Sequence, residues 1–153
     1  MKALVLAPPL AGAGGIQRYT ACLVRALRDL LGHPNVRCVS IPEPANGSGS
    51  RFSAGFKLRF GWQAIKESTR WKPDLIICSH VGLGPIGWLL ANVGKHPYWI
   101  VVYGIEGWAE LPGWKKEPLR RADRVIAISK DPKVVDLAQR YKKGQTAPPP
   151  VAK

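Results

Sequence analysis

The feature that most constrains the fold is a series of short apolar runs that do not alternate with polar residues. These runs cover residues 3–7, 36–41, 75–78, 98–103 and 124–128. Strands buried on both faces have this pattern, whereas strands exposed on one face alternate. Segments with helical periodicity separate the runs, over 16–31, 57–70, 85–93, 113–122 and 131–142. The sequence therefore predicts an α/β fold, a Rossmann-like doubly wound parallel sheet in a single domain.

Periodicity also predicts which side chains of two helices face the core. For the helix over 16–31 the inner stripe is Ile16, Tyr19, Leu23, Leu27 and Leu30, and for the helix over 57–70 it is Leu58, Trp62 and Ile65. Residues 42–55 are rich in Pro, Gly, Ser and Asn, which predicts a loop. The domain is expected to cover residues 1–143, and the proline-rich residues 144–153 are expected to form a disordered tail.

The chain is strongly basic, with 23 Lys and Arg against 10 Asp and Glu in 153 residues. A net charge of +13 favours a polyanionic partner, although basic soluble proteins also reach such values. Residues 51–72 mix basic and aromatic side chains, so they form either a surface for anionic lipid or the charged outer face of an ordinary helix. A second basic cluster spans residues 115–124, but no nucleic-acid recognition motif accompanies it, so no specific nucleic-acid partner is expected.

Cysteine usage indicates a reducing compartment. Cys22, Cys38 and Cys78 lie in apolar segments, without CxxC spacing or a histidine cluster. Free thiols, a cytoplasmic location and no metal site are therefore expected. The sequence also shows no signal peptide and no apolar run long enough to span a membrane.

A glycine-rich loop follows the first predicted strand, with Gly12, Gly14 and Gly15 just before the next helix. Such a loop either presents backbone N–H groups to an anion or forms a tight turn without a ligand. The dinucleotide fingerprint requires a third small residue where Gln17 stands. Its acidic residue at the end of the second strand is also missing, because Ser40-Ile41-Pro42 stands there. NAD binding therefore remains only a weak alternative.

Polar residues follow the later predicted strands, at the edge where ligands bind in sheets of this class. His80 comes directly after the strand over 75–78, and it is either a structural histidine or a site residue. Glu106 lies between glycines after the strand over 98–103. That carboxylate either bonds a sugar hydroxyl or orients a base, or it is a solvated loop acid. Ser129 and Lys130 occupy the same place after the strand over 124–128.

Four segments in order carry a resemblance to a known family. They are Gly14-Gly15-Ile16-Gln17-Arg18-Tyr19, residues 72–80 (KPDLIICSH), residues 103–108 (YGIEGW) and residues 121–130 (RADRVIAISK). Together they resemble the N-terminal, acceptor-side domain of GT-B glycosyltransferases of family 4, the group 1 type. The resemblance covers about residues 1–140.

This resemblance implies retaining transfer from a nucleotide-diphospho-sugar to a glycan or lipid-linked acceptor, without a cofactor or an obligatory metal. On that analogy Gly14 and Gly15 approach the donor diphosphate, with the charge of Arg18 nearby. The catalytic residues would be His80 and Glu106. The acceptor side of the cleft would contain Tyr103, Gly104, Ser129 and Lys130. Preorganised N–H groups suit this reaction because the leaving diphosphate gains charge as the sugar departs.

The sequence departs from the family pattern in two places. Many members have His where this chain has Tyr103, and the family's donor-binding domain does not follow residue 130. We therefore expect one half of a GT-B fold, inactive without a donor-binding domain, which a separate chain could supply. Peripheral contact with the inner membrane face is a further expectation. The main alternative is a non-catalytic binding module for anionic or lipid-linked glycans at a membrane surface.

Overall fold

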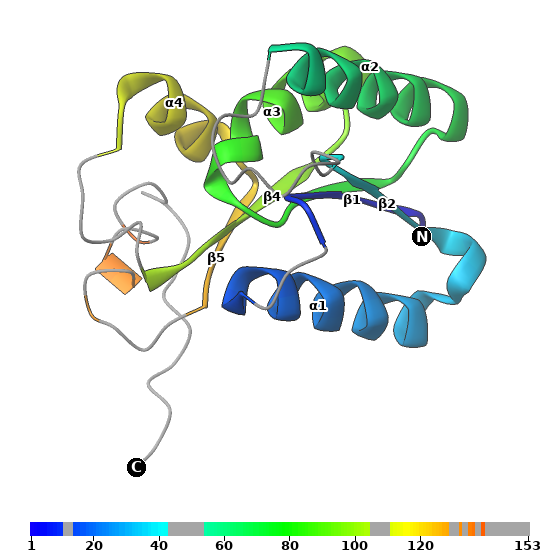
Figure 1. The fold of residues 1–153 in the computed structure, drawn as a ribbon, viewed down its shortest axis with the longest axis horizontal. Helices are drawn as coiled ribbons and strands as arrows, with labels where there is room; N and C mark the ends of the chain where they lie inside the picture. Colours follow the sequence, from blue (N-terminus) through cyan, green and yellow to red (C-terminus); the bar gives the residue numbers. More distant parts are fainter. Residues whose placement is uncertain are drawn as a thin grey trace.

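A computed structural model describes residues 1–10, 14–42, 54–104 and 111–128, with the single positions 132, 135, 136 and 139. The side chains of residues 54, 56 and 57 fall outside this description. Strands and helices alternate along the described chain (Figure 1). In order they are β1 (Ala3–Ala7), α1 (Gly15–Leu31), η1 (His33–Asn35), β2 (Val36–Ser40), α2 (Ala54–Trp71), β3 (Leu75–Cys78), η2 (Val81–Leu83), α3 (Gly84–Gly94), β4 (Tyr98–Val102), α4 (Gly113–Arg121) and β5 (Arg124–Ala127).

The strands form one five-stranded sheet in the order β2-β1-β3-β4-β5, and every pair is parallel. This confirms the predicted Rossmann-like parallel sheet. All residues of β1 and β3 are buried, as the lack of alternation predicts, whereas the edge strands β2 and β5 are partly exposed. The chain passes from β1 to β2 on one side and then to β3 on the other. The sheet therefore has a topological switch point between β1 and β3, where ligands bind in this class of fold.

Helices cover both faces of the sheet, with α1 on one face and α2, α3 and α4 on the other (Figure 1). Two apolar clusters match these layers. Val5 and Ile77 pack under α1 with Val24, while Leu4 and Ile76 pack with Phe60 of α2 and other residues. Successive residues of one strand thus serve opposite cores, which is why the central strands tolerate no polar residue.

The predicted strands end within one residue of the observed ones, but α2 differs from its prediction. The helix begins at Ala54, so the predicted loop over 42–55 is too long by two residues. The predicted inner stripe is wrong for two of its three residues, because Leu58 and Trp62 are 74% and 71% exposed. Its third residue, Ile65, is partly buried and packs against the core. Phe60, Ala64 and Ser68 are buried instead. These residues recur every four positions, and two small side chains allow the helix to approach the sheet closely.

In α1 the predicted inner residue Leu30 is 80% exposed, while Thr20 and Val24 are the buried residues of that helix. Glycine ends α1, because Gly32 has φ +87° and its N–H donates to the carbonyl of Arg28. Most of the predicted helix over 131–142 and the predicted tail over 144–153 lie outside the described residues. Among the helices that the structure describes, none has the length and apolarity that crossing a membrane requires.

Candidate functional site

A cavity of about 350 Å³ opens at the switch point between β1 and β3. Its walls come from four parts of the chain: the loop after β1, the start of α1, the end of β2 and the turn after β3. The lining residues are Pro8, Pro9, Ile16, Gln17, Ile41, His80, Gly82 and Leu83. The fold thus brings the predicted glycine-loop region and the predicted His80 to one site.

The start of α1 has no side chain that neutralises its exposed N–H groups. Gly14 is the N-cap and offers no side-chain hydrogen bond, and the first turn has no acidic residue. Arg18 is exposed on this turn, and its own backbone N–H donates to the Gly14 carbonyl at 3.1 Å. A cation in the first turn opposes the helix dipole, so this helix end has a local positive potential that favours an anion.

Gly15 leaves open space at the first residue of the helix. A Cβ built there would meet no atom within 4 Å, and the residue is exposed. Internal packing therefore does not explain the glycine. The absence of a side chain instead allows another molecule to approach the backbone closely.

A buried hydroxyl pair joins α1 to the end of β3. The Thr20 hydroxyl donates to the Ser79 hydroxyl at 3.3 Å, and both residues are 0% exposed. Two buried hydroxyl groups that satisfy each other fix the distance between the helix and the strand end. The pair holds the start of α1 beside the neighbouring residue, His80.

His80 lies at the carboxyl end of β3 with a half-buried ring. Its Nδ1 accepts a hydrogen bond from the Gly82 N–H at 2.9 Å, which caps η2. The neutral ring then carries its proton on Nε2, so it acts as a donor at that atom. Burial, with the positive charge of Lys115 on α4 as a smaller cause, lowers the pKa of His80 below 6.5. The ring is therefore neutral at pH 7.

Gly82 also limits how the His80 ring can sit. A Cβ at residue 82 would lie 3.0 Å from the His80 Nδ1, which is closer than ordinary packing. The absence of a side chain on Gly82 thus makes room for the ring in its observed position. Gly82 is a positioning residue that the sequence alone did not indicate.

The aromatic ring of Tyr103 packs against His80. The Tyr103 ring stacks on His80 with 6.1 Å between ring centroids, and Tyr19 of α1 meets Tyr103 edge to face at 5.9 Å. Tyr103 is only 8% exposed. These contacts tie the loop after β4 to α1 and β3.

The predicted site residues therefore fall into three groups. His80 lines the cavity. Gly14, Gly15 and Arg18 lie at the start of α1, and Ile16 and Gln17 of the same turn line the cavity. Tyr103 contacts His80, and Gly104 follows it in the chain. Glu106, Ser129 and Lys130 lie outside the described residues.

The sequence did not indicate three contributions to the site: Gly82, Gln17 in the cavity wall, and Thr20 as the partner of Ser79. Thr20 carried a signal, because a polar residue stands on the apolar face of a helix only with a partner. Within the described ranges, no group of three or more His, Cys, Asp or Glu side chains could hold a metal ion.

No protein-family model matches this sequence. No curated protein matches it either. Two solved structures are similar in fold. The crystal structure of Anabaena Alr3699/HepE in complex with UDP matches with a TM-score of 0.57 and 16% identity, over 89% of this chain and 40% of that one. The crystal structure of Acinetobacter baumannii MurG matches with a TM-score of 0.48 and 20% identity, over 83% of this chain and 41% of that one.

The chain thus spans less than half the length of each of these two proteins. At such low identity the similarity concerns the fold. The chain is a Rossmann-like domain whose fold is similar to part of the HepE structure.

Proposed function

We propose that this chain is the N-terminal, acceptor-side domain of a retaining GT-B glycosyltransferase of family 4. Its donor would be a nucleotide-diphospho-sugar, and its acceptor a glycan or a lipid-linked glycan. The similarity in fold to a protein crystallised with UDP supports a uridine nucleotide as the first donor to test. The four family-like segments support the same proposal.

The observation that carries the proposal is the uncapped start of α1 beside the His80 cavity. As the sugar leaves the donor, negative charge grows on the diphosphate. The N–H groups of residues 15–17 and the charge of Arg18 would stabilise that charge. These groups are already oriented by the helix, so little reorganisation accompanies the reaction.

His80 would act as a hydrogen-bond donor through Nε2, because Nδ1 is occupied by Gly82. A hydrogen-bond donor at this position is suited to bind a sugar hydroxyl or a departing oxygen, and it is less suited to abstract a proton. Glu106, Gly104, Ser129 and Lys130 belong to the same proposal as acceptor-side residues, with Glu106 as a second catalytic group. Tyr103 would support the His80 ring from the acceptor side.

The proposal requires a donor-binding domain from elsewhere, either in a longer polypeptide or in a separate chain. The acceptor-side domain of this chain would correspond to residues 1–143, with residues 144–153 as a tail. No cofactor or metal is part of the proposal. A cytoplasmic location is proposed because all three cysteines, Cys22, Cys38 and Cys78, are unpaired thiols.

The strand order does not support the alternative that the chain is an NAD-binding domain. The dinucleotide-binding order is 3-2-1-4-5-6, in which the third strand lies beside the second. Here β3 pairs with β1 instead. An NAD titration followed by calorimetry would test this alternative, and saturable binding would favour it over sugar transfer.

A transfer assay with radiolabelled UDP-sugars tests the proposal. The chain would be assayed alone and with a candidate donor-binding chain, such as the product of a neighbouring reading frame. We expect transfer only from the mixture. We expect Gly15→Ala to lower the rate, because its Cβ enters the space of the diphosphate.

Gly113→Ala is the matched control, since Gly113 also opens a helix with no atom within 4 Å of a Cβ. It should leave the rate unchanged. Equal rates for both variants would contradict the placement of the diphosphate at α1. Transfer by the chain alone would contradict the requirement for a second domain.

A further inference from the structure

We propose that the outer face of α2 and α3 is a docking surface for an anionic lipid bilayer. The proposal does not depend on glycosyl transfer, because it rests on a different part of the molecule. The surface consists of an exposed apolar strip and an adjacent basic stripe. The apolar strip is Leu58 and Trp62 of α2 with Leu89 and Val93 of α3.

The apolar strip is well exposed, with Leu58 at 74%, Trp62 at 71% and Val93 at 69%. A groove of about 310 Å³ runs between the two helices, and Ile65, Leu89 and Val93 are among its lining residues. Trp62 borders a second hollow that shares Ile65 with this groove. Trp62, Leu89 and Val93 are thus parts of one surface, and Leu58 lies about one helical turn before Trp62 on α2. Exposed apolar groups gathered in this way usually mark an interaction site.

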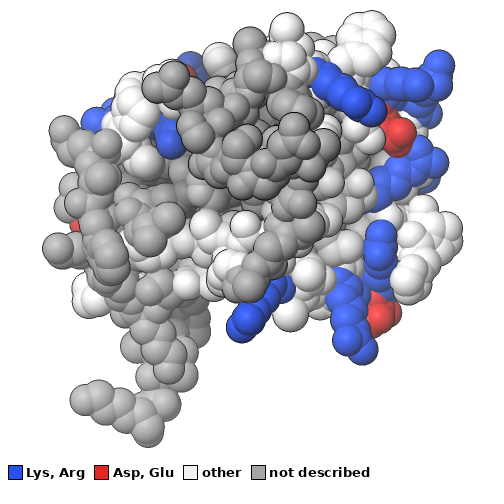
Figure 2. Space-filling model, viewed as in Figure 1, with Lys and Arg blue, Asp and Glu red and all other residues white. Residues whose placement is uncertain are grey.

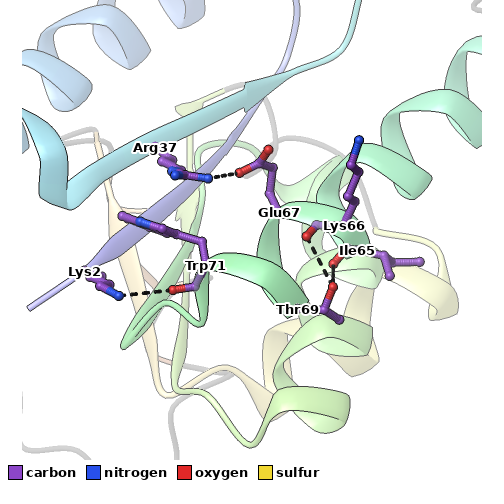
Figure 3. A network of polar contacts seen from close by, with 7 residues as sticks. All are labelled: Lys2, Arg37, Ile65, Lys66, Glu67, Thr69 and Trp71. Atoms are coloured by element: carbon purple, nitrogen blue, oxygen red, sulfur yellow. Dashed lines mark hydrogen bonds and ion pairs between the residues drawn. The ribbon is translucent and has the colours of Figure 1, made fainter.

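A basic stripe runs along α2 beside Trp62. Arg59, Lys66 and Arg70 are spaced by seven and four residues, which places them on one line of a helix. Glu67 is the single acidic residue of α2, and it pairs with Arg37 of β2 at 2.5 Å. Figure 3 shows Lys66 pointing away from that pair. The only carboxylate of the helix is therefore engaged at the sheet and does not lie in the basic stripe.

A lysine follows each of the helices α2 and α3, in a backbone conformation that favours glycine. Lys72 follows α2 with φ 49°, and Lys95 caps α3 with φ 54°. They are the only two non-glycine residues with positive φ in the described part of the chain. Lys72 lines the groove between the helices, and Lys95 stands between the lining residues Gly94 and His96. Lysine at two strained positions around one groove favours a role for the charge, since glycine would fit the backbone better.

Charge and composition together favour lipid as the partner. From residue 54 to residue 97 the sequence has six Lys and Arg against two acidic residues, and α3 has no charged residue at all. The other acid of this region, Asp74, accepts a hydrogen bond from the backbone N–H of Lys2. Tryptophan beside Lys and Arg is typical of elements that lie in the headgroup region of a membrane. Figure 2 shows that Lys and Arg greatly outnumber Asp and Glu among the described residues on its right side, which includes the end of α2.

Several basic side chains of α4 are engaged in local contacts. Arg120 and Arg121 of α4 pair with Glu117, and Lys115 lies over the Trp114 ring. These residues provide matched controls, because α4 also has an exposed tryptophan beside basic residues.

Flotation with vesicles tests the proposal on the full chain. The vesicles would be pure phosphatidylcholine, or phosphatidylcholine with phosphatidylglycerol, each at low and high salt. We expect binding only to the anionic vesicles, with strong loss at high salt. The double variant Lys66→Gln with Arg70→Gln should bind about thirtyfold more weakly, since each basic residue near such a surface contributes about fivefold. Trp62→Ala should lower binding severalfold.

Arg120→Gln with Arg121→Gln removes the same net charge, and Trp114→Ala removes a tryptophan that is 60% exposed, against 71% for Trp62. Both controls should bind nearly as well as the unmodified chain. Equal losses in the controls would overturn the proposal, because binding would then follow overall charge alone. Failure of the unmodified chain to bind anionic vesicles, or equal binding to neutral ones, would also overturn it. A lack of sugar transfer would not affect this result.

The double variant Lys72→Gly with Lys95→Gly separates an effect on lipid binding from an effect on stability. The double variant should raise the midpoint of thermal unfolding, because glycine adopts both left-handed conformations without strain. At the same time it should weaken vesicle binding. A variant that is more stable and binds as tightly as the unmodified chain would contradict the role of these two lysines.

Discussion

His80 is positioned by two neighbours: Gly82 through a hydrogen bond and Tyr103 through ring stacking. The hydrogen bond determines which ring nitrogen can donate. Burial, and to a lesser extent the charge of Lys115, lowers the pKa of the ring and favours its neutral form. A histidine after a buried strand could be predicted from the sequence as a site candidate. Its role as a cap could not, because the N–H partner and the position of Lys115 depend on how η2 and α4 fold around it.

Substitution of His80 separates its capping role from its titration. His80→Ala should lower the free energy of unfolding by about 1 kcal/mol, because the cap of η2 is lost. His80→Asn should lose less, since its side-chain oxygen can accept the Gly82 N–H. Urea denaturation at pH 8 would measure both. Equal stability of the alanine variant and the unmodified chain would contradict the capping role.

Titration of His80 makes stability depend on pH in a defined window. Its pKa in the folded chain lies below its ordinary value of 6.5, so the unfolded chain binds more protons between the two values. The contribution of His80 to the free energy of unfolding is therefore fully present above pH 6.5. It is lost as the pH falls through 6.5 toward the folded pKa. Urea denaturation across this range should show a smaller decrease for His80→Asn than for the unmodified chain.

Among the helices and strands, α2 is the element whose buried face was predicted wrongly from the sequence. Residues 54–71 contain four large aromatic residues, and a sequence-based prediction places the largest side chains inward. The sheet instead accepts Phe60, Ala64 and Ser68, since small residues let the backbone approach. Trp62 and Leu58 are left outside. The choice between two neighbouring stripes depends on the shape of the sheet surface, which the sequence does not contain.

Two mid-helix glycines should respond in opposite ways to the same substitution. A Cβ at Gly87 of α3 would overlap the Cys78 Sγ, which is fully buried, so Gly87→Ala should destabilise by about 1–3 kcal/mol. At Gly61 of α2 the nearest atom is 3.9 Å away, so Gly61→Ala should stabilise by up to about 1 kcal/mol. Chemical denaturation measures both changes.

The variant Gly87→Ala with Cys78→Ala tests the cause of the first effect. Removing the sulfur makes room for the new methyl group, so the two changes should cost less together than the sum of their separate effects. Strict additivity would show that the contact between α3 and β3 does not cause the destabilisation.

At the scale of the whole molecule, the five apolar runs were sufficient to predict the sheet. Strands buried on both faces leave a direct sequence signal, so β1 and β3 could be placed to the residue. Right-handed connections agree with helices on both faces of the sheet, but the strand order β2-β1-β3-β4-β5 came from the structure. The site was predictable in part, because the carboxyl edge of the sheet is known once the strands are known. The partners of His80 come from segments distant in the sequence and required the structure.

The molecule also separates its two proposed surfaces. The candidate site lies at the carboxyl ends of the strands, whereas Lys72 and Lys95 stand at the ends of α2 and α3. A bilayer that docks on the outer face of these helices would leave the cavity at the switch point accessible. Lipid binding and nucleotide binding can therefore be tested independently on one preparation.

The most direct test of the proposed diphosphate site at α1 is an NMR titration of the ¹⁵N-labelled chain with UDP at millimolar concentration. We expect changes in the amide resonances of Gly15, Ile16 and Gln17 and in the ring resonances of His80. The start of α4 at Gly113 is the internal control, since it is an equally open helix end, and it should change little. No change at residues 15–17, or an equal change at Gly113, would contradict the proposal that α1 receives the donor diphosphate.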